Sequence, residues 1–296
     1  MPVKDWLAAL VIVCAWGINF VMIKIALGEI PPLLLGALRF TFVAFPAILF
    51  VKKPNLPWRT IVLYGLTISF GQFVFLFTAM HVGMPAGLAS LVLQAQVFFT
   101  VLIAALLLGE SVQRHNILGM GVAVLGLILI EQGAEEGSMT LLGFVLTLLA
   151  ALSWGCGNIM AKVAGKVDVV GLVIWGALIP PLPFLALSWL IEGPQTIQAS
   201  LANISYVGVA AVAYLALVAT VIGYVLWGGL LTRHPARKVA PLTLLVPVIG
   251  LVSAAVLLDE HLQFVQWLGG AIVMLGLVVN VFGNRLMQQA RTILRR

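Results

Sequence analysis

The sequence WGINFVMIK at residues 16–24 returns as WGCGNIMAK at residues 154–162. Both copies follow the pattern W-G-x4-M-x-K, and 138 residues separate them. Chance similarity between apolar helices explains shared leucines and valines better than it explains this pattern. We therefore expect an internal repeat, with halves at residues 1–133 and 134–296. An offset of 150 residues adds further pairs: Tyr64 with Tyr214, Pro85 with Pro235, Glu110 with Glu260, Leu118-Gly119 with Leu268-Gly269, and Gly126 with Gly276.

The composition places the chain in a membrane. Of its 296 residues 62% are hydrophobic and 9% are charged, whereas soluble domains carry roughly 25% charged residues. A membrane-spanning helix needs about 20 mostly apolar residues, and ten such segments follow one another here with connections too short for a soluble domain, which excludes most enzyme classes. The expected spans are 6–27, 32–51, 60–80, 85–108, 114–131, 140–162, 169–191, 203–231, 238–258 and 262–283.

Five spans in each half make the second copy enter the membrane from the opposite side. The expected fold is therefore an all-α integral membrane protein whose ten helices form two inverted-topology repeats, the arrangement typical of alternating-access carriers. Basic residues collect on cytoplasmic loops. With both termini cytoplasmic, all of the 16 basic residues except Lys24 and Arg39 fall at cytoplasmic ends. These are Lys4, Lys52, Lys53, Arg59, Arg114, Lys162, Lys166, Arg233, Arg237, Lys238, Arg285, Arg291, Arg295 and Arg296, while Glu29, Glu131, Glu135, Glu136, Glu192, Asp259 and Glu260 lie outside.

Polar side chains inside the spans are the candidates for a substrate site, because such groups are costly in lipid and face a cavity or the bundle interior. One interpretation is a cavity whose amides and hydroxyls bind the ammonium and carboxylate of a small zwitterion. The other is interhelical hydrogen bonding, worth about 0.6–2 kcal/mol per contact. The substrate-binding candidates are Trp16, Asn19, Arg39, Tyr64, Ser69, Gln72, Gln94, Trp154, Asn158, Tyr214 and Tyr224.

Two of these side chains leave an explicit choice. Gln94 and Gln96 lie on roughly opposite faces of one helix, so we expect one of them to be structural. Arg39 has no basic counterpart in the second half. Its guanidinium can bind a substrate carboxylate, or it can pair with a carbonyl or a glutamate across the bundle.

Coupling and gating candidates lie nearer the helix ends. They are Lys24, Lys162, Glu131 and Pro247. For the two lysines, snorkelling to the interface is the alternative. All ten acidic residues fall at or near helix ends, so no mid-membrane carboxylate is available for a proton relay. Prolines at 46, 180, 181, 183, 241 and 247 are expected to interrupt the second, seventh and ninth helices, and carbonyls freed near Pro247 can face a cavity.

Several kinds of chemistry lack their motifs. The sequence has no phosphate-binding G-x-x-x-x-G-K-[ST] loop, so we expect neither ATPase activity nor an ATPase subunit. We expect no cofactor and no metal site, and we interpret Cys14 and Cys156 as small buried hydrophobes. The net charge of +6 follows from membrane orientation and does not indicate nucleic-acid binding.

The opening pattern of each half and Leu38-Arg39-Phe40 resemble the EamA branch of the drug/metabolite transporter superfamily. Other stretches are similar to members of that family that export O-acetylserine and cysteine. The resemblance implies a bacterial inner-membrane exporter of amino acids and related metabolites. Such an exporter would be a monomer or a homodimer in the lipid bilayer. Its cavity would be framed by helices 1, 3, 4, 6, 8 and 9. The similar stretches are YGLTISFGQFVFLFTAMHVGMPAGLASLVLQAQVFFT (64–100), IWGALIP (174–180) and APLTLLVPVIGLVSAAVLLDE (240–260).

Other functions remain open at this point. An exporter of other metabolites or of lipophilic drugs would have the same fold, because fold alone does not define function. A passive channel fits less well, since inverted repeats and interrupted helices suit a carrier that rocks about a central site. An intramembrane enzyme would need an embedded nucleophile and base, or a metal set, and the sequence offers neither.

Overall fold

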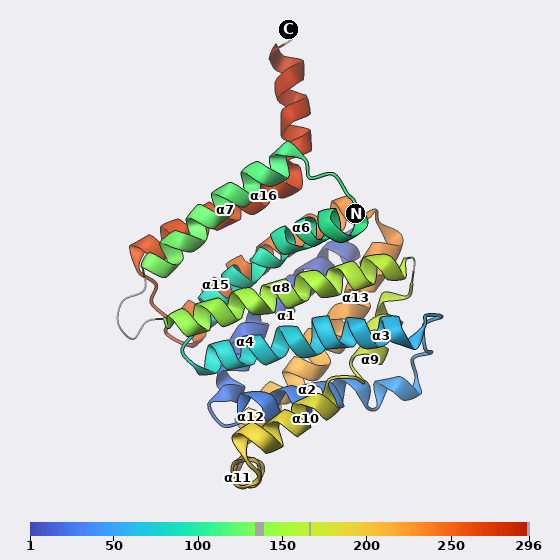
Figure 1. The fold of residues 1–296 in the computed structure, drawn as a ribbon, viewed down its shortest axis with the longest axis vertical. Helices are drawn as coiled ribbons and strands as arrows, with labels where there is room; N and C mark the ends of the chain where they lie inside the picture. The colour runs from blue at the N-terminus through green and yellow to red at the C-terminus, as the bar shows by residue number, and fades with distance from the viewer. Residues whose placement is uncertain (134–138, 166, 295–296) are drawn as a thin grey trace.

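The structure is a computed structural model that describes residues 1–133, 139–165 and 167–294, and all side chains within them except those of 236–237 and 284–294. Within these residues, ten stretches of helix are long and apolar enough to cross a membrane, which confirms the expected all-α architecture (Figure 1). The spans are α1 (Val3–Leu27), α2–η1 (Pro32–Ala44, Ala47–Leu49), α3–η2–α4 (Trp58–Tyr64, Gly65–Gly71, Gln72–His81), α5–η3–α6 (Ala86–Val92, Leu93–Ala95, Gln96–Leu108), α7 (Arg114–Gln132), α8 (Leu141–Ala164), α9–α10–η4 (Val169–Gly176, Pro181–Leu187, Ser188–Glu192), α12–η5–α13 (Tyr206–Ala213, Tyr214–Ile222, Gly223–Arg233), η6–α15 (Ala240–Leu244, Leu245–Leu257) and α16 (Phe264–Leu294).

The two ends of the spans are named here from the first helix. The N side is the side on which α1 begins at Val3, and the far side is the one on which α1 ends at Leu27. Some residues assigned to loops from the sequence lie outside the described part of the structure. They are Glu135, Glu136, Lys166, Arg295 and Arg296, and the side chains of Arg237, Arg285 and Arg291.

Two short helices lie between the spans. The first, α11 (Pro194–Asn203), was not expected from the sequence and connects the seventh and eighth spans on the far side. It begins at a proline in its first turn, directly after Gly193, whose φ of 85° suits glycine and allows the sharp change of direction. The second, α14 (Ala236–Val239), precedes η6 on the N side.

The spans are interrupted at equivalent places in the two halves. π-helical turns occupy η2 in the third span and η5 in the eighth, and 3₁₀ turns occupy η3 in the fourth and η6 in the ninth. Each pair of interruptions overlaps when 150 residues are added to the first member. The repeat seen in the sequence therefore includes the irregular turns. Prolines account for further breaks, because α2 ends two residues before Pro46 and α10 begins at Pro180-Pro181.

The helix ends show the same correspondence. Glu110 and Glu260 each donate their backbone N–H to the carbonyl six residues earlier, at 3.4 and 3.3 Å. In both cases the preceding residue has a positive φ, 68° at Gly109 and 54° at Asp259. The fourth and ninth spans thus end in the same left-handed cap, a geometry that satisfies the last helical carbonyls.

The fifth and tenth spans, α7 and α16, pack against each other as an antiparallel pair through reciprocal glycine contacts (Figure 1). A Cβ on Gly119 would lie 2.6 Å from the carbonyl oxygen of Gly276, and one on Gly276 would lie 2.5 Å from that of Gly119. Gly126 and Gly269 repeat the relation at 2.6 and 2.7 Å. Corresponding helices of the two halves therefore run in opposite directions, as an inverted repeat requires.

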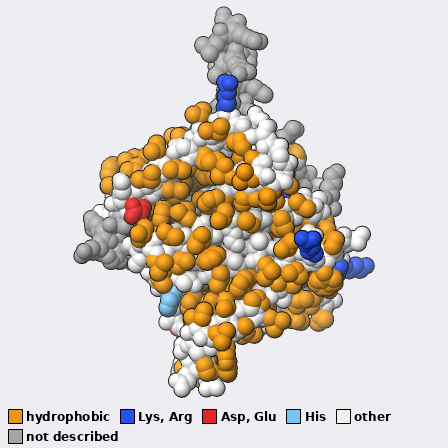
Figure 2. Space-filling model, viewed as in Figure 1, with side chains coloured by type: hydrophobic (Ala, Val, Ile, Leu, Met, Phe, Trp, Pro, Cys, Tyr) orange, Lys and Arg blue, Asp and Glu red, His pale blue; other side chains and the backbone are white. Residues whose placement is uncertain are grey.

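The largest buried cluster lies toward the far side of the bundle. Phe77, Met80, Met84 and Leu88 are fully buried there, where the third and fourth spans approach each other. The exterior is largely apolar, and Figure 2 shows hydrophobic side chains across most of one face with few charged groups. An exterior of this kind is matched to lipid.

Candidate functional site

Arg39 of α2 is at the centre of the candidate site. Its side chain is 4% exposed, and its guanidinium donates to the Asn19 Oδ1 of α1 at 3.2 Å and to the Thr220 Oγ1 of η5 at 3.0 Å. The guanidinium carbon lies 4.2 Å from the centre of the Phe73 ring in α4. Within the described residues, its Nε has no hydrogen-bond partner. A buried cation thus joins three spans of the first half to one of the second, with one donor left over.

The π-helical turn of the eighth span positions Thr220. Its hydroxyl donates to the carbonyl of Leu215, five residues earlier, at 2.9 Å, which leaves the oxygen lone pairs directed at Arg39. π-helical turns are rare and occur frequently at functional sites. The local irregularity therefore orients Thr220, which among the described residues is the acceptor that the second half contributes to Arg39.

Aromatic candidates pack between α1 and the eighth span. The Trp16 indole donates to the Ala219 carbonyl at 2.9 Å, and the Tyr214 hydroxyl donates to the Ala15 carbonyl at 3.1 Å. The ring of Tyr224 lies 5.3 Å from that of Trp16. Trp16, Tyr214 and Tyr224 thus pack where α1 meets the eighth span. These two spans carry Asn19 and Thr220, which together with Arg39 and Phe73 are called the Arg39 group.

The candidates of the third span lie at or in its π-helical turn: Tyr64 directly precedes the turn, Ser69 lies within it and Gln72 directly follows it. Tyr64, Ser69 and Gln72 are 5–7% exposed, and their side chains make no hydrogen bonds within the described part of the chain. The turn packs tightly on α9, since a Cβ at Gly65 would lie 2.5 Å from the carbonyl oxygen of Gly176. Gln72 precedes Phe73 and is therefore adjacent in sequence to the ring beneath Arg39.

The candidates of the fourth and sixth spans form a separate group. Asn158 donates to Gln96 Oε1 at 2.8 Å and to Thr100 Oγ1 at 3.0 Å, which ties α8 to α6. Trp154, one turn earlier, is half-buried and packs against the cluster formed by Tyr64, Ile68 and Leu172. Gln94 points elsewhere, as its amide lies 3.5 Å from the carbonyl of Thr243. The structure therefore does not bring Trp154, Asn158 and Gln94 into the Arg39 group.

The coupling candidates occupy three different surroundings. Lys24 donates to the Met80 carbonyl at 3.3 Å on the far side, and Lys162 pairs with Glu110 at 2.6 Å on the N side. Glu131 is half-buried near the end of α7. Pro247 is buried in α15 and has no N–H, so the carbonyl four residues earlier is free to accept from Gln94.

The sequence did not indicate the roles of Thr220 and Phe73, nor that glutamates at the helix ends cap other helices. A single threonine or phenylalanine is common in an apolar span, so neither Thr220 nor Phe73 stands out from its neighbours in the sequence. The glutamates were noted only for their position, but three of them bind backbone amides of other helices: Glu192 at Leu33 and Leu34, Glu260 at Ala86 and Gly87, and Glu29 at Ser205.

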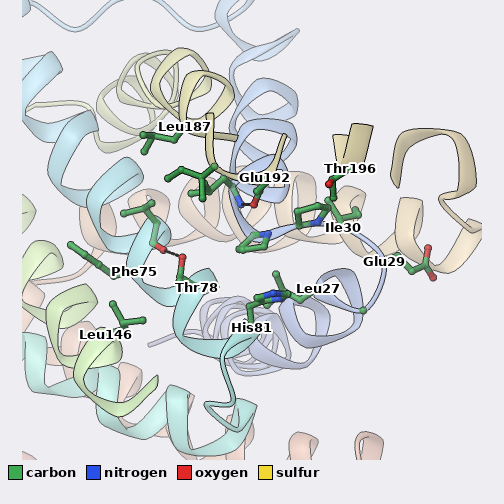
Figure 3. A pocket seen from close by; sticks show the side chains of 16 residues that line it. Leu27, Glu29, Ile30, Phe75, Thr78, His81, Leu146, Leu187, Glu192 and Thr196 are labelled. Carbon is green, nitrogen blue, oxygen red and sulfur yellow. Dashed lines mark hydrogen bonds between the residues drawn. The ribbon is translucent and has the colours of Figure 1, made fainter. Parts of the chain in front are cut away.

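A cavity of about 630 Å³ opens at the far side of the bundle. It lies between the α1–α2 connection, α4, α8, α10 and α11, and Figure 3 shows Phe75, Thr78 and His81 of α4 along one wall. None of the substrate-binding, coupling or gating candidates predicted from the sequence lines it. This cavity is therefore distinct from the Arg39 group.

A family model described as the EamA-like transporter family matches residues 5–132 and 141–282. The chain belongs to this family. Among the relatives of this EamA-like chain, a probable amino-acid metabolite efflux pump of Salmonella typhimurium is 51% identical, over 98% of this chain and 99% of the relative. A protein of the same description from Escherichia coli K12 is 50% identical, over 96% and 97%.

A solved crystal structure supports the fold independently. It is 21% identical to this EamA-like chain, with a TM-score of 0.64, and the match covers 97% of this chain and 99% of the other. The likeness shows the fold alone. The two matched segments of the family model correspond to five spans each, so the chain is a multi-pass membrane transporter and not an enzyme.

Proposed function

We propose that this EamA-like protein exports amino-acid metabolites across the bacterial cytoplasmic membrane by alternating access. The observation that carries the proposal is the full-length 51% identity to a probable amino-acid metabolite efflux pump. Cysteine and O-acetylserine are the substrates that we propose more specifically. Their support is the similarity of residues 64–100 to exporters of these two solutes.

The proposed orientation places the N side in the cytoplasm. Basic residues on described parts of the chain support it, because they lie at N-side ends of spans, as the positive-inside rule requires. With this orientation, the far-side cavity opens toward the exterior. The supporting residues are Lys4, Lys52, Lys53, Arg59, Arg114, Lys162, Arg233 and Lys238.

The proposed substrate site is the Arg39 group, defined as Arg39, Asn19, Thr220 and Phe73. A guanidinium recognises a carboxylate through directional N–H donors, and the Nε of Arg39 has no other partner in the described residues. The group joins residues 1–133 to residues 134–296, the two halves whose relative movement would alternate access. A site shared by both halves changes as they move, which is what a carrier needs.

An efflux assay tests the substrate claim. Cells that overproduce the protein should release more cysteine and O-acetylserine than control cells, and an unrelated basic amino acid should show no increase. Addition of a protonophore distinguishes proton-driven export from facilitated efflux, because export that depends on the proton gradient stops when the gradient collapses. Absence of increased release for both proposed substrates would exclude this specificity, and release of other metabolites would point to the alternative exporter function.

A further inference from the structure

A glutamate from the end of the ninth span holds the start of the fourth. Glu260 accepts the backbone N–H of Ala86 at 2.7 Å and that of Gly87 at 2.9 Å. Gly87 lets the two spans approach closely, since a Cβ there would lie 3.3 Å from Ala254, Leu251 and the Glu260 carboxylate. A carboxylate at a helix N-terminus satisfies otherwise unpaired amides and interacts favourably with the helix dipole. Glu260 is thus a clasp between α5 and α15 on the far side.

Glu110 has the same place in the first half but a different partner. It follows the same left-handed cap at the end of the fourth span, on the N side. Its carboxylate pairs with Lys162 at 2.6 Å, and both side chains are about half exposed, 47% and 50%. Two residues that the repeat makes equivalent therefore have inequivalent contacts.

The partners are themselves related by the repeat. Lys162 corresponds to Lys24, which stands on the far side and donates to the Met80 carbonyl at 3.3 Å. The start of α5, after Pro85, corresponds to the start of α14, after Pro235. The repeat therefore places one glutamate, one lysine and one helix start of this related set on each side of the membrane: Glu260, Lys24 and the start of α5 on the far side, and Glu110, Lys162 and the start of α14 on the N side.

The packing of the fourth and ninth spans shows which side is closed. The spans meet at their 3₁₀ turns, where Gln94 lies 3.5 Å from the Thr243 carbonyl. On the far side of this crossing α5 packs closely along α15. On the N side, α6 packs along α8, and in the described residues it has no comparable packing with η6. The contact between the fourth and ninth spans is therefore closed on the far side, where Glu260 is the clasp. The far-side cavity lies elsewhere, between the α1–α2 connection, α4, α8, α10 and α11.

We propose that Glu110 and Glu260 exchange roles when the transporter changes state. In the other state Glu110 leaves Lys162 and caps the first amides of α14, while Glu260 leaves α5 and pairs with Lys24. The proposal rests on the alternating access proposed above. Each state contains one helix cap and one exposed ion pair, so the exchange keeps both carboxylates partnered and leaves the two states close in free energy. A small difference of this kind is what lets a substrate shift their populations.

The two glutamates are predicted to have opposite effects on one reporter. Exposed ion pairs contribute little to stability, whereas a helix cap contributes more. Glu260→Gln therefore weakens mainly the far-closed state, and Glu110→Gln weakens mainly the far-open state. A clasp with only a static role predicts an effect of Glu260→Gln alone.

The reporter is Ser90→Cys in a background of Cys14→Ala and Cys156→Ala. Ser90 is 2% exposed, and its hydroxyl donates to the Gly87 carbonyl at 2.7 Å and lies 3.5 Å from the Pro247 carbonyl, so it marks the α5–α15 contact. The purified full-length protein in lipid nanodiscs, without substrate, is labelled with a hydrophilic maleimide. Glu260→Gln is expected to raise the labelling rate about fivefold, and Glu110→Gln to lower it by a similar factor. In the variant that combines Glu110→Gln and Glu260→Gln, the labelling rate should return toward that of the protein with both glutamates.

Glu192→Gln is the matched control. The Glu192 carboxylate accepts the backbone N–H groups of Leu33 and Leu34 at 2.6 and 3.1 Å, so it also caps a helix. The repeat places no glutamate at the equivalent position of the first half, so the Glu192→Gln variant should leave the labelling rate unchanged. An unchanged rate in Glu110→Gln, or a shift in the same direction as in Glu260→Gln, would overturn the exchange. If the protein exports the proposed substrates but the two variants do not shift the labelling rate, only the exchange of roles is rejected. If the two variants shift the labelling rate in opposite directions but the protein does not export cysteine or O-acetylserine, only the proposed substrates are rejected.

Discussion

Arg39 shows how one side chain can combine structure and recognition. An arginine buried in a membrane protein normally pairs with an acid or faces water. Here neutral oxygens of Asn19 and Thr220 and the face of Phe73 surround it, and no carboxylate lies within ion-pair distance among the described residues. The positive charge of Arg39 is therefore only partly compensated, and a substrate carboxylate would supply the negative charge that the protein does not place beside it.

Substitution of Arg39 should change carboxylate recognition specifically. Arg39→Lys keeps the charge but loses the planar fork, so KM for cysteine should rise roughly tenfold, because hydrogen bonds to charged groups contribute about 1.5–3 kcal/mol. Arg39→Gln should abolish the preference for cysteine over cysteamine, which lacks the carboxylate. Transport into proteoliposomes measures both. Equal loss of transport for the two solutes, with a normal size-exclusion profile, would contradict the proposed role.

The sequence singled out Arg39 because a cation inside an apolar span is rare, but it did not identify its neighbours. Periodicity placed Gln94 and Gln96 on different faces, and the structure has them bonded to different helices. Thr220 was not predictable, because its orientation follows from a π-helical turn that no local pattern announces. The site predictions were therefore best where charge is unusual and weakest where the backbone is irregular.

At the scale of helices, the acidic residues act chiefly on helix starts. Glu192 and Glu260 each bind two backbone amides of another span, and Glu29 binds Ser205, the residue before α12. The first backbone N–H groups of a helix have no hydrogen-bond partner within it. Leaving such a group unpaired costs most free energy near lipid, where water cannot replace the missing partner. The carboxylates that the sequence shows at span ends are thus explained by local hydrogen bonding.

Glu29 predicts a specific dependence of stability on pH. The Ser205 hydroxyl, 2.7 Å away, and the Ser205 amide, at 2.8 Å, lower the pKa of the Glu29 carboxyl. A lowered pKa in the folded state gives stability that is present above the unfolded pKa and lost as the pH falls through the folded value. Glu29→Gln should therefore lower Tm at pH 7, and the difference from wild type should shrink below about pH 4. A pH-independent difference between the two Tm curves would contradict the role of the charge.

The spans themselves were highly predictable, whereas their interruptions were only partly so. Length and hydropathy fix a spanning helix, and the eighth span, expected at 203–231, is Tyr206–Arg233. Prolines indicated the breaks in the second, seventh and ninth spans. The helix α11 was missed because its sequence, PQTIQASLAN, is too polar and too short to stand out between two spans.

In the whole molecule, the seam between α7 and α16 is one of the contacts between the two halves, alongside the packing of α1 on α15 and of α4 and α6 on α8. Because each of the four glycines contacts the backbone of its partner, the seam has no space for a side chain at these positions. We propose that this seam holds residues 1–133 and 134–296 together while the crossing of the fourth and ninth spans changes. A rigid contact near the axis of the repeat is compatible with motion elsewhere.

Gly126→Ala tests the seam, with Gly121→Ala on the same helix as the control. A Cβ at Gly126 would lie 2.6 Å from the Gly269 carbonyl oxygen, whereas one at Gly121 meets nothing within 4 Å. Overpacking costs about 1–3 kcal/mol, so Gly126→Ala should lower Tm, whereas Gly121→Ala should leave it unchanged or raise it, since alanine favours a helix by about 1 kcal/mol. Thermal unfolding of the purified variants, followed by size exclusion, measures the difference. Equal Tm values for the two would mean that the halves are not held by close backbone packing.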